Sequence, residues 1–287
     1  MPSTREIRRR IRGVKNIKQV TRAMNMIAAA RLRRAQQKAE SARPYAERLS
    51  EILQDVQAGG AGARHPLLVK RDVRRIGLLL VTSDRGLCGG FNATMNREAY
   101  QFINAQDAEV GLITVGKKGR DYFRTHGLAV DNHFPQPSRD VRLEELGPIS
   151  KQIIADYSSG KYDQIFVGYS KFATVLKSTA AIVQLLPLES RPRAEKSLRA
   201  AYQFEPQAEE LLNTLLPQYV EVLIYRSLVE SLASEQAARM IAMKGATDSA
   251  SEMIDNLTRE YNRVRQGSIT TQILEVVSGA EALEQAH

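Results

Sequence analysis

Long helix-forming stretches occupy both ends of this 287-residue chain. Near the amino end, apolar side chains recur about every 3.3 residues, which is closer to a coiled-coil seam than to the broad apolar face of a globular helix. No proline interrupts this stretch before Pro44, and the helical pattern resumes beyond it until a glycine-rich run at 58–62. We therefore predict one long helix over residues 1–57. Its apolar stripe consists of Ile7, Ile11, Val14, Ile17, Val20, Met24 and Ile27.

The carboxyl end repeats this pattern over residues 207–287, where Pro217 is the one proline. At 1.5 Å per residue, about 75 helical residues would reach roughly 110 Å, and the amino-terminal helix would reach roughly 80 Å. A compact domain of this chain length has a radius of gyration of only about 19 Å. Neither helix fits inside such a globule, so we expect the two helices to bury their stripes against each other as an antiparallel coiled coil.

The middle of the chain, over residues 73–190, alternates between strand-like and helical segments. Such alternation favours a mainly parallel sheet covered by helices. The expected fold class is thus α/β with long helices: an antiparallel coiled coil of the terminal helices with an α/β domain inserted between them. Residues 58–72 are the expected linker, and residues 191–206 an expected polar loop. The strands are expected at 76–82, 110–115, 164–169 and 180–188, and the helices at 92–105, 117–126 and 144–158.

Positive charge gathers at the amino end. Lys and Arg number 41 against 32 Asp and Glu, a net charge of +9, and residues 1–48 alone hold 14 basic and three acidic side chains. Dense basic residues on a helix are typical of nucleic-acid binding, and this is the alternative function. However, residues 1–44 lack aromatic side chains for base stacking, and the same helix carries an apolar stripe. The basic side chains could simply form the solvated face of a coiled coil. In a third interpretation, they attract an acidic surface on a protein partner.

Catalytic and cofactor motifs are weak in this sequence. The run 83–92, SDRGLCGGFN, follows a predicted strand but lacks the spacing of a dinucleotide-binding or P-loop motif, so we expect a structural turn whose glycines supply positive φ. Cys88 has no histidine nearby in sequence, and metal-ligand spacings are absent. We therefore expect no catalytic residue, no cofactor and no metal.

The single thiol, Cys88, excludes an internal disulfide framework and favours a reducing compartment. No apolar run is long enough to span a bilayer, and the basic start of the chain lacks the apolar core of a signal peptide. We expect an intracellular protein without a membrane span.

Four sequence blocks resemble the gamma subunit family of F-type ATP synthases, and they occur in order from one end of the chain to the other. The resemblance implies a rotor that has no active site of its own: a coiled coil around which alpha and beta subunits form a hexamer, with an inserted Rossmann-like domain. Rotation of its asymmetric profile would drive the beta sites through their conformations in turn. The blocks are Ile7–Gln36, Ser83–Asn92, Ser234–Lys244 and Tyr261–Ala280.

The resemblance also implies site residues and partners. Gly267 departs from the alanine expected there. The implied partners are the alpha and beta subunits, the epsilon subunit and the ring of c subunits, with no nucleic acid and with membrane contact only through the complex. The implied location is the cytoplasmic face of the bacterial inner membrane. The implied beta contacts are Met24, Arg239, Gln266 and Thr270, with Arg33 and Arg34 facing an acidic beta segment; Tyr202 and Glu205 form the implied foot on the c-ring, and the Cys88 turn lies near epsilon.

Overall fold

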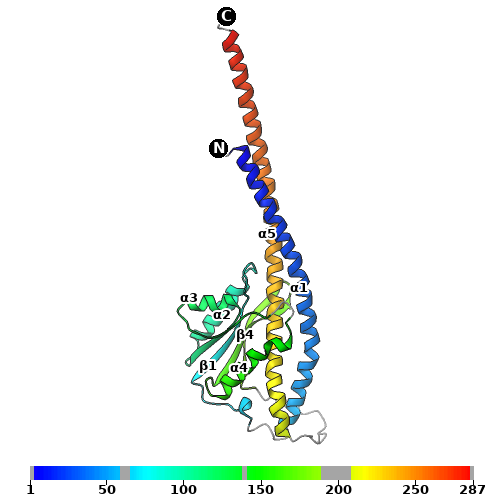
Figure 1. Ribbon diagram of the computed structural model, residues 1–287, viewed down its shortest axis with the longest axis vertical. Coiled ribbons are helices and arrows are strands. Elements are labelled where there is room, and N and C mark those ends of the chain that lie inside the picture. Colours follow the sequence, from blue (N-terminus) through cyan, green and yellow to red (C-terminus); the bar gives the residue numbers. More distant parts are fainter. Residues whose placement is uncertain (1–2, 59–64, 138–140, 189–207, 285–287) are drawn as a thin grey trace. The chain divides into compact units, whose positions relative to one another are not determined.

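The computed structural model describes residues 3–58, 65–137, 141–188 and 208–284 (Figure 1). Both predicted long helices are confirmed, and each continues through its internal proline, Pro44 or Pro217. In chain order the elements are α1 (Thr4–Ala58), η2 (Pro66–Leu68), β1 (Arg75–Val81), α2 (Phe91–Asn104), β2 (Glu109–Val115), α3 (Lys117–Thr125), β3 (Val130–Phe134), η3 (Leu143–Leu146), α4 (Gly147–Ser158), β4 (Gln164–Thr174), β5 (Lys177–Leu186) and α5 (Ala208–Glu284).

The five strands form one sheet in the order β3-β2-β1-β4-β5. β1 pairs in parallel with both β2 and β4, and β2 with β3, whereas β5 runs antiparallel to β4. The predicted mainly parallel sheet is therefore confirmed. β1 lies at the centre, and its residues from Ile76 to Val81 are all buried, as expected for a strand covered on both faces.

Two details of the strand prediction were wrong. β3 was not predicted, because its polar residues Asp131, Asn132 and His133 hide the apolar signal of a strand. β4 and β5 form a longer hairpin than expected, since the pairing continues to Thr174 and Lys177, where the side chains are exposed and polar. Hydrogen bonds between the two backbones extend a hairpin beyond the apolar residues that identify it in sequence.

The chain divides into two compact units, and each long helix contributes to both. The first unit comprises residues 1–27 and 240–287, and the second comprises residues 28–239. The predicted domain boundaries, which give each long helix a domain of its own, remain a prediction.

Two apolar clusters lie on opposite faces of the sheet in the second unit. On one face, Leu80 and Met95 pack with Phe123, so α2 and α3 cover the sheet there. The other face packs against α4 and the long helices, including Leu49 of α1 and Leu216 of α5. Among the described residues, no helix has the length and apolarity needed to cross a membrane.

Candidate functional site

The helix pair of the first unit is held by polar groups as well as apolar ones. Thr247 Oγ1 lies 2.8 Å from Thr21 Oγ1, and Thr21 is buried. One helical turn along, Asn25 Nδ2 donates a 2.7 Å hydrogen bond to the Met240 carbonyl. Residue numbers rise on α1 as they fall on α5, so the predicted antiparallel pairing is confirmed within this unit. Polar side chains in the seam, such as these part-buried pairs, fix the register of a coiled coil.

The predicted seam of α1 was wrong at Ile17, Val20 and Ile27. Ile17, Val20 and Ile27 are 57%, 58% and 51% exposed, whereas Thr21 is 8% exposed. Among the buried and half-buried positions, one series advances by alternating steps of four and three residues, the 3.5-residue repeat that keeps a seam facing its partner: 7, 11, 14, 18, 21, 25 and 28. The predicted stripe takes several consecutive steps of three, so it drifts around the helix and leaves the seam.

These residues instead make a second apolar stripe on the outer side of α1. We call Ile17, Val20, Met24 and Ile27 the outer stripe; Met24 is half-buried and the other three are exposed. Their spacing of three, four and three residues places them along one side of the helix. Large apolar side chains aligned on one side of a helix, and half-exposed, indicate a surface made for another molecule.

The far part of α5 is also uncovered. Every residue from Arg265 to Ala280 is exposed, including Gln266 and Thr270 of the predicted beta contacts. Thr270 Oγ1 donates to the Gln266 carbonyl at 3.0 Å, so its hydroxyl is held against its own helix. The apolar residues of this segment are Ile269, Ile273, Leu274, Val276 and Val277, exposed by 42 to 72%. The segment therefore offers polar and apolar side chains together.

In the second unit, the turn after β1 is tightly constrained. Ser83 N donates to Asn92 Oδ1 at 3.0 Å, and Ser83 Oγ donates to the Arg85 carbonyl at 2.7 Å. Gly89 has a φ of 56°, so the predicted use of glycine for positive φ is confirmed there. Leu87, however, adopts a φ of 62°, a conformation that costs a branched side chain roughly 1–2 kcal/mol. We therefore find strain in this turn that the sequence did not predict.

Cys88 lies inside this turn and is 2% exposed. Asn92 Nδ2 lies 3.2 Å from its sulfur. Burial raises the pKa of the Cys88 thiol, an effect that the hydrogen bond with Ser83 and the charge of Arg239 only partly oppose. The thiol therefore stays protonated near neutral pH and is a poor nucleophile, in agreement with the expected packed cysteine. Nothing in the described residues tests the predicted proximity of epsilon.

Arg239 faces this turn from α5. Its Nη1 lies 2.5 Å from Oε1 of Glu235, and its Nη2 donates to the carbonyls of Arg85 and Gly86 at 3.4 and 3.3 Å. Glu235 Oε2 accepts a 2.6 Å hydrogen bond from Gln136 Nε2. The side chains of Glu235 and Arg239 are only 4% and 9% exposed. The structure therefore gives Arg239 partners within its own chain.

Sequence reasoning missed Glu235 and Gln136. A signal for Glu235 exists: Glu235 and Arg239 are an acid and a base four residues apart, and they are the only charged residues between 231 and 243. Gln136, which follows β3, carries no such signal. Of the other predicted residues, Arg33 and Arg34 are exposed on α1. Tyr202 and Glu205 lie outside the described residues.

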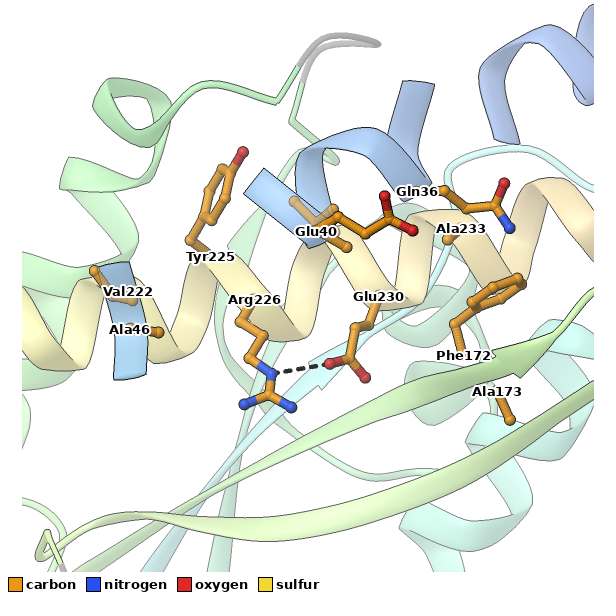
Figure 2. A pocket seen from close by; sticks show the side chains of 12 residues that line it. Gln36, Glu40, Ala46, Phe172, Ala173, Val222, Tyr225, Arg226, Glu230 and Ala233 are labelled. Atoms are coloured by element: carbon orange, nitrogen blue, oxygen red, sulfur yellow. Dashed lines mark hydrogen bonds and ion pairs between the residues drawn. The ribbon is translucent and has the colours of Figure 1, made fainter. Parts of the chain in front are cut away.

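A cavity of about 200 Å³ lies between α1, α5 and the end of β4 (Figure 2). Its charged groups include Arg226 and Glu230, which pair with each other at 2.9 Å, and the carboxylate of Glu40 on α1. The described residues hold no cluster of three or more His, Cys, Asp or Glu that would bind a metal.

Comparisons with known proteins show which proteins this chain is similar to in sequence and fold. A family model described as ATP synthase matches residues 3–283. The ATP synthase gamma chain of Pelotomaculum thermopropionicum is 43% identical over 284 residues, which cover 99% of this chain and 100% of the relative. That of Chloroflexus aurantiacus is 44% identical over 289 residues and covers 99% of each.

Solved structures of ATP synthases also contain chains that are similar to this one. The central stalk and c-ring structure of the Tetrahymena thermophila mitochondrial ATP synthase contains a chain that is 25% identical, with a TM-score of 0.61, and the match covers 79% of this chain and 99% of that one. A chain of the Euglena gracilis mitochondrial ATP synthase is 16% identical with a TM-score of 0.66, covering 98% and 94%, and this likeness concerns the fold alone. With a family match from end to end and full-length relatives above 40% identity, this chain belongs to the ATP synthase gamma chain family.

Proposed function

We propose that this chain, as the central rotor stalk of an ATP synthase, transmits rotation to the beta subunits chiefly through the outer stripe of α1. The observation that carries the proposal is that α1 exposes large apolar side chains while it places polar side chains in the seam. Ile17, Val20 and Ile27 are more than half exposed, while Thr21 and Asn25 occupy the seam. This arrangement supports an apolar surface on the rotor that is kept for other subunits.

The size of this surface suits a contact that forms and breaks at every step. Complete burial of a Val or Ile side chain contributes about 1.5–3 kcal/mol, and a side chain that is already half-buried gains about half of that. A few such contacts guide a moving surface without fixing it permanently. Polar contacts of about 1 kcal/mol add to them, and we assign these to the exposed Gln266 and Thr270.

Charge supports the same partner. The amino-terminal part of α1 is strongly basic, and Arg33 and Arg34 are exposed. We assign these two residues to an acidic segment of beta, where attraction between opposite charges acts over several ångströms without a fixed register. The exposed apolar end of α5 fits inside a sleeve formed by the alpha and beta subunits. The comparisons offer no support for the alternative of nucleic-acid binding.

The remaining assignments extend the proposal to the whole complex. The chain itself carries out no catalysis, the segment with Tyr202 and Glu205 meets the c-ring, and epsilon docks near the Cys88 turn. The complex lies at the cytoplasmic face of the bacterial inner membrane, where it couples ion flow to ATP synthesis or hydrolysis. A contact between Arg239 and beta remains a prediction, which competes with the internal partners of that side chain.

The test is a triple substitution of the outer stripe, Ile17→Ser, Val20→Ser and Ile27→Ser, in a complex reconstituted with alpha and beta. We expect coupled ATP turnover to fall at least about fivefold, because roughly 1 kcal/mol is lost at each contact. The matched control is Met26→Ser, which is 60% exposed on the same helix but about 100° around it from Ile27. Normal turnover in the triple variant, with assembly intact, would refute the proposal.

A further inference from the structure

Open α/β sheets bind their ligands outside the carboxyl ends of the strands, where the strand order reverses. In this sheet the reversal lies between β1 and β4. Here α5 occupies that position: Ser234 Oγ donates a 3.0 Å hydrogen bond to the carbonyl of Ser170 in β4. The remaining cavity, lined by Thr82, Gln136 and Glu235 among others, has a volume of only about 10 Å³. That is room for about one water molecule, so the crevice is filled by the chain's own helix.

The contact at this position is built from buried charges. Removing a carboxylate and a guanidinium from water costs several kcal/mol each, and their mutual attraction offsets this cost only if further hydrogen bonds complete the pair. One further bond comes from α5 itself, where Gln236 Nε2 donates to Glu235 Oε1 at 3.2 Å, and the others come from the α/β part of the second unit. Gln136 donates to Glu235, and the Arg85 and Gly86 carbonyls accept from Arg239.

The same network reaches the next helix. Gln136 Oε1 accepts a 3.2 Å hydrogen bond from the backbone N–H of Asp84, and Asp84 Oδ1 accepts one of 3.0 Å from the N–H of Lys117. The segments after β1 and β3 and the start of α3 are therefore tied together, and both segments bind one turn of α5. Glu235 is bonded to the segment after β3, and Arg239 is bonded to the turn after β1. Rotation of α5 about its own axis would therefore break the hydrogen bonds to one of these two segments.

We propose that Glu235 and Arg239 make the carboxyl-edge crevice of this sheet a rotational anchor, which holds α5 at a fixed angle to the α/β part of the second unit. Arg239 is a positioning residue in this device, because it acts through the turn at 83–90. The positive φ of Leu87 agrees with this role: a strained turn persists where its surroundings hold it. The crevice thus binds a helix in the place where related folds bind a nucleotide.

The single cysteine reports on the anchor without any added probe. Cys88 is buried in the turn that Arg239 holds, so its rate of alkylation by iodoacetamide measures how often the turn opens. In the isolated full-length chain, we expect Arg239→Met to raise this rate at least about tenfold, because the buried Glu235 loses its charge partner. The rate should remain almost independent of low urea concentrations, since the opening is local.

Arg226→Met is the matched control: Arg226 pairs with Glu230 at the same spacing on the same helix, and in the described part of the chain it lines a different cavity from the one beside the turn. It should leave the alkylation of Cys88 unchanged. Loss of Arg239 also removes a charge that lowers the pKa of Cys88, so it makes the thiol intrinsically less reactive, and a faster rate must come from opening.

Two results would overturn the anchor: unchanged alkylation in Arg239→Met, or acceleration that rises steeply with urea and matches a loss of global stability. The inference goes beyond the proposed contacts with beta, and it is measured without partner subunits. Its failure would therefore leave the outer stripe untouched, and failure of the outer stripe would leave the anchor untouched.

Discussion

The phenol of Tyr162 donates a 2.6 Å hydrogen bond to Oδ2 of Asp131 at the amino edge of the sheet. Tyr162 is fully buried, and burial, followed by this hydrogen bond, raises its pKa above the usual value, so the phenol stays a neutral donor. Gly111 makes room for the pair: a Cβ there would lie 2.5 Å from Asp131 Oδ2 and 2.6 Å from Tyr162 Cε1. The glycine in β2 is therefore required by two side chains from other segments.

Replacing Gly111 with alanine should lower the free energy of unfolding of the second unit by about 1–3 kcal/mol, the usual cost of overpacking. Hydrogen exchange of the β2 amides measures it. Gly13→Ala is the control, because that glycine lies in α1 with no atom within 4 Å of the added carbon. It should stabilise the helix by about 0.5–1 kcal/mol. Unaltered protection of β2 in Gly111→Ala would show that the sheet can shift to accept the methyl group.

The hydroxyls of Thr21 and Thr247 should be energetically coupled. A double-mutant cycle with Thr21→Val and Thr247→Val is expected to give a coupling free energy of about 0.5–1.5 kcal/mol. Thermal unfolding followed by circular dichroism supplies the four values. A cycle with Thr258→Val in place of Thr247→Val is the control, since the Thr258 hydroxyl donates to the Ile254 carbonyl of its own helix at 2.7 Å. Zero coupling between Thr21 and Thr247 would mean that the 2.8 Å contact does not stabilise the pair.

Leu87→Gly should raise the stability of the second unit by up to about 1 kcal/mol, because glycine adopts a φ of 62° without strain. Little burial is lost, since Leu87 is 64% exposed. Leu176, at the tip of the β4–β5 hairpin, is 87% exposed and has no positive φ. Leu176→Gly should therefore destabilise the protein slightly or leave it unchanged. Urea unfolding of both variants tests the difference, and equal effects would contradict strain at Leu87.

Asp163 should contribute stability that depends on pH. Its Oδ2 accepts hydrogen bonds from the backbone N–H groups of Arg74 and Arg75 at 2.8 and 3.0 Å, and these bonds, that of Arg74 foremost, lower the pKa of the carboxyl. A depressed pKa means that the stabilisation is complete above the unfolded value of about 3.9 and disappears as the pH falls through the folded value.

The advantage of the natural chain over Asp163→Asn should therefore be constant from about pH 5 to 7 and shrink below about pH 4. Urea unfolding at several pH values measures it. Asp163 is half-buried, so solvent screens part of the effect and keeps it small. If the stability difference between the natural chain and Asp163→Asn increased toward acid pH, the lowered pKa of Asp163 would be contradicted.

Much of the fold was predictable because it follows from local patterns. Helices longer than a globule and the alternation of strands with helices are visible in the sequence, and both were confirmed. β3 was not predictable, because Asp131 and His133 serve distant partners, Tyr162 and Thr114. The prediction of which α1 residues form the seam was wrong for a related reason. Asn25 is stabilised in the seam by the Met240 carbonyl, and no local pattern in the sequence reveals this contact.

The candidate site was less accessible to prediction than the fold. The resemblance to a family nominated Arg239 as a surface contact, yet the side chain is buried between Glu235 and the turn after β1, more than 150 residues away in sequence. Contacts over such separations are created by the sheet topology. The outer stripe was visible as apolar spacing, but only the structure separates Ile17 and Val20 from the seam.

The uncovered end of α5 affects how readily the isolated chain is cleaved by proteases. From Arg265 to Ala280 every residue is exposed, and the hydrogen bonds described for this segment, such as that from Thr270 to the Gln266 carbonyl, lie within α5 itself. An isolated helix of this length is marginally stable in water. Such a terminus opens readily and is the preferred place for a protease to begin. Limited proteolysis of the isolated chain should therefore begin between Arg265 and Ala280.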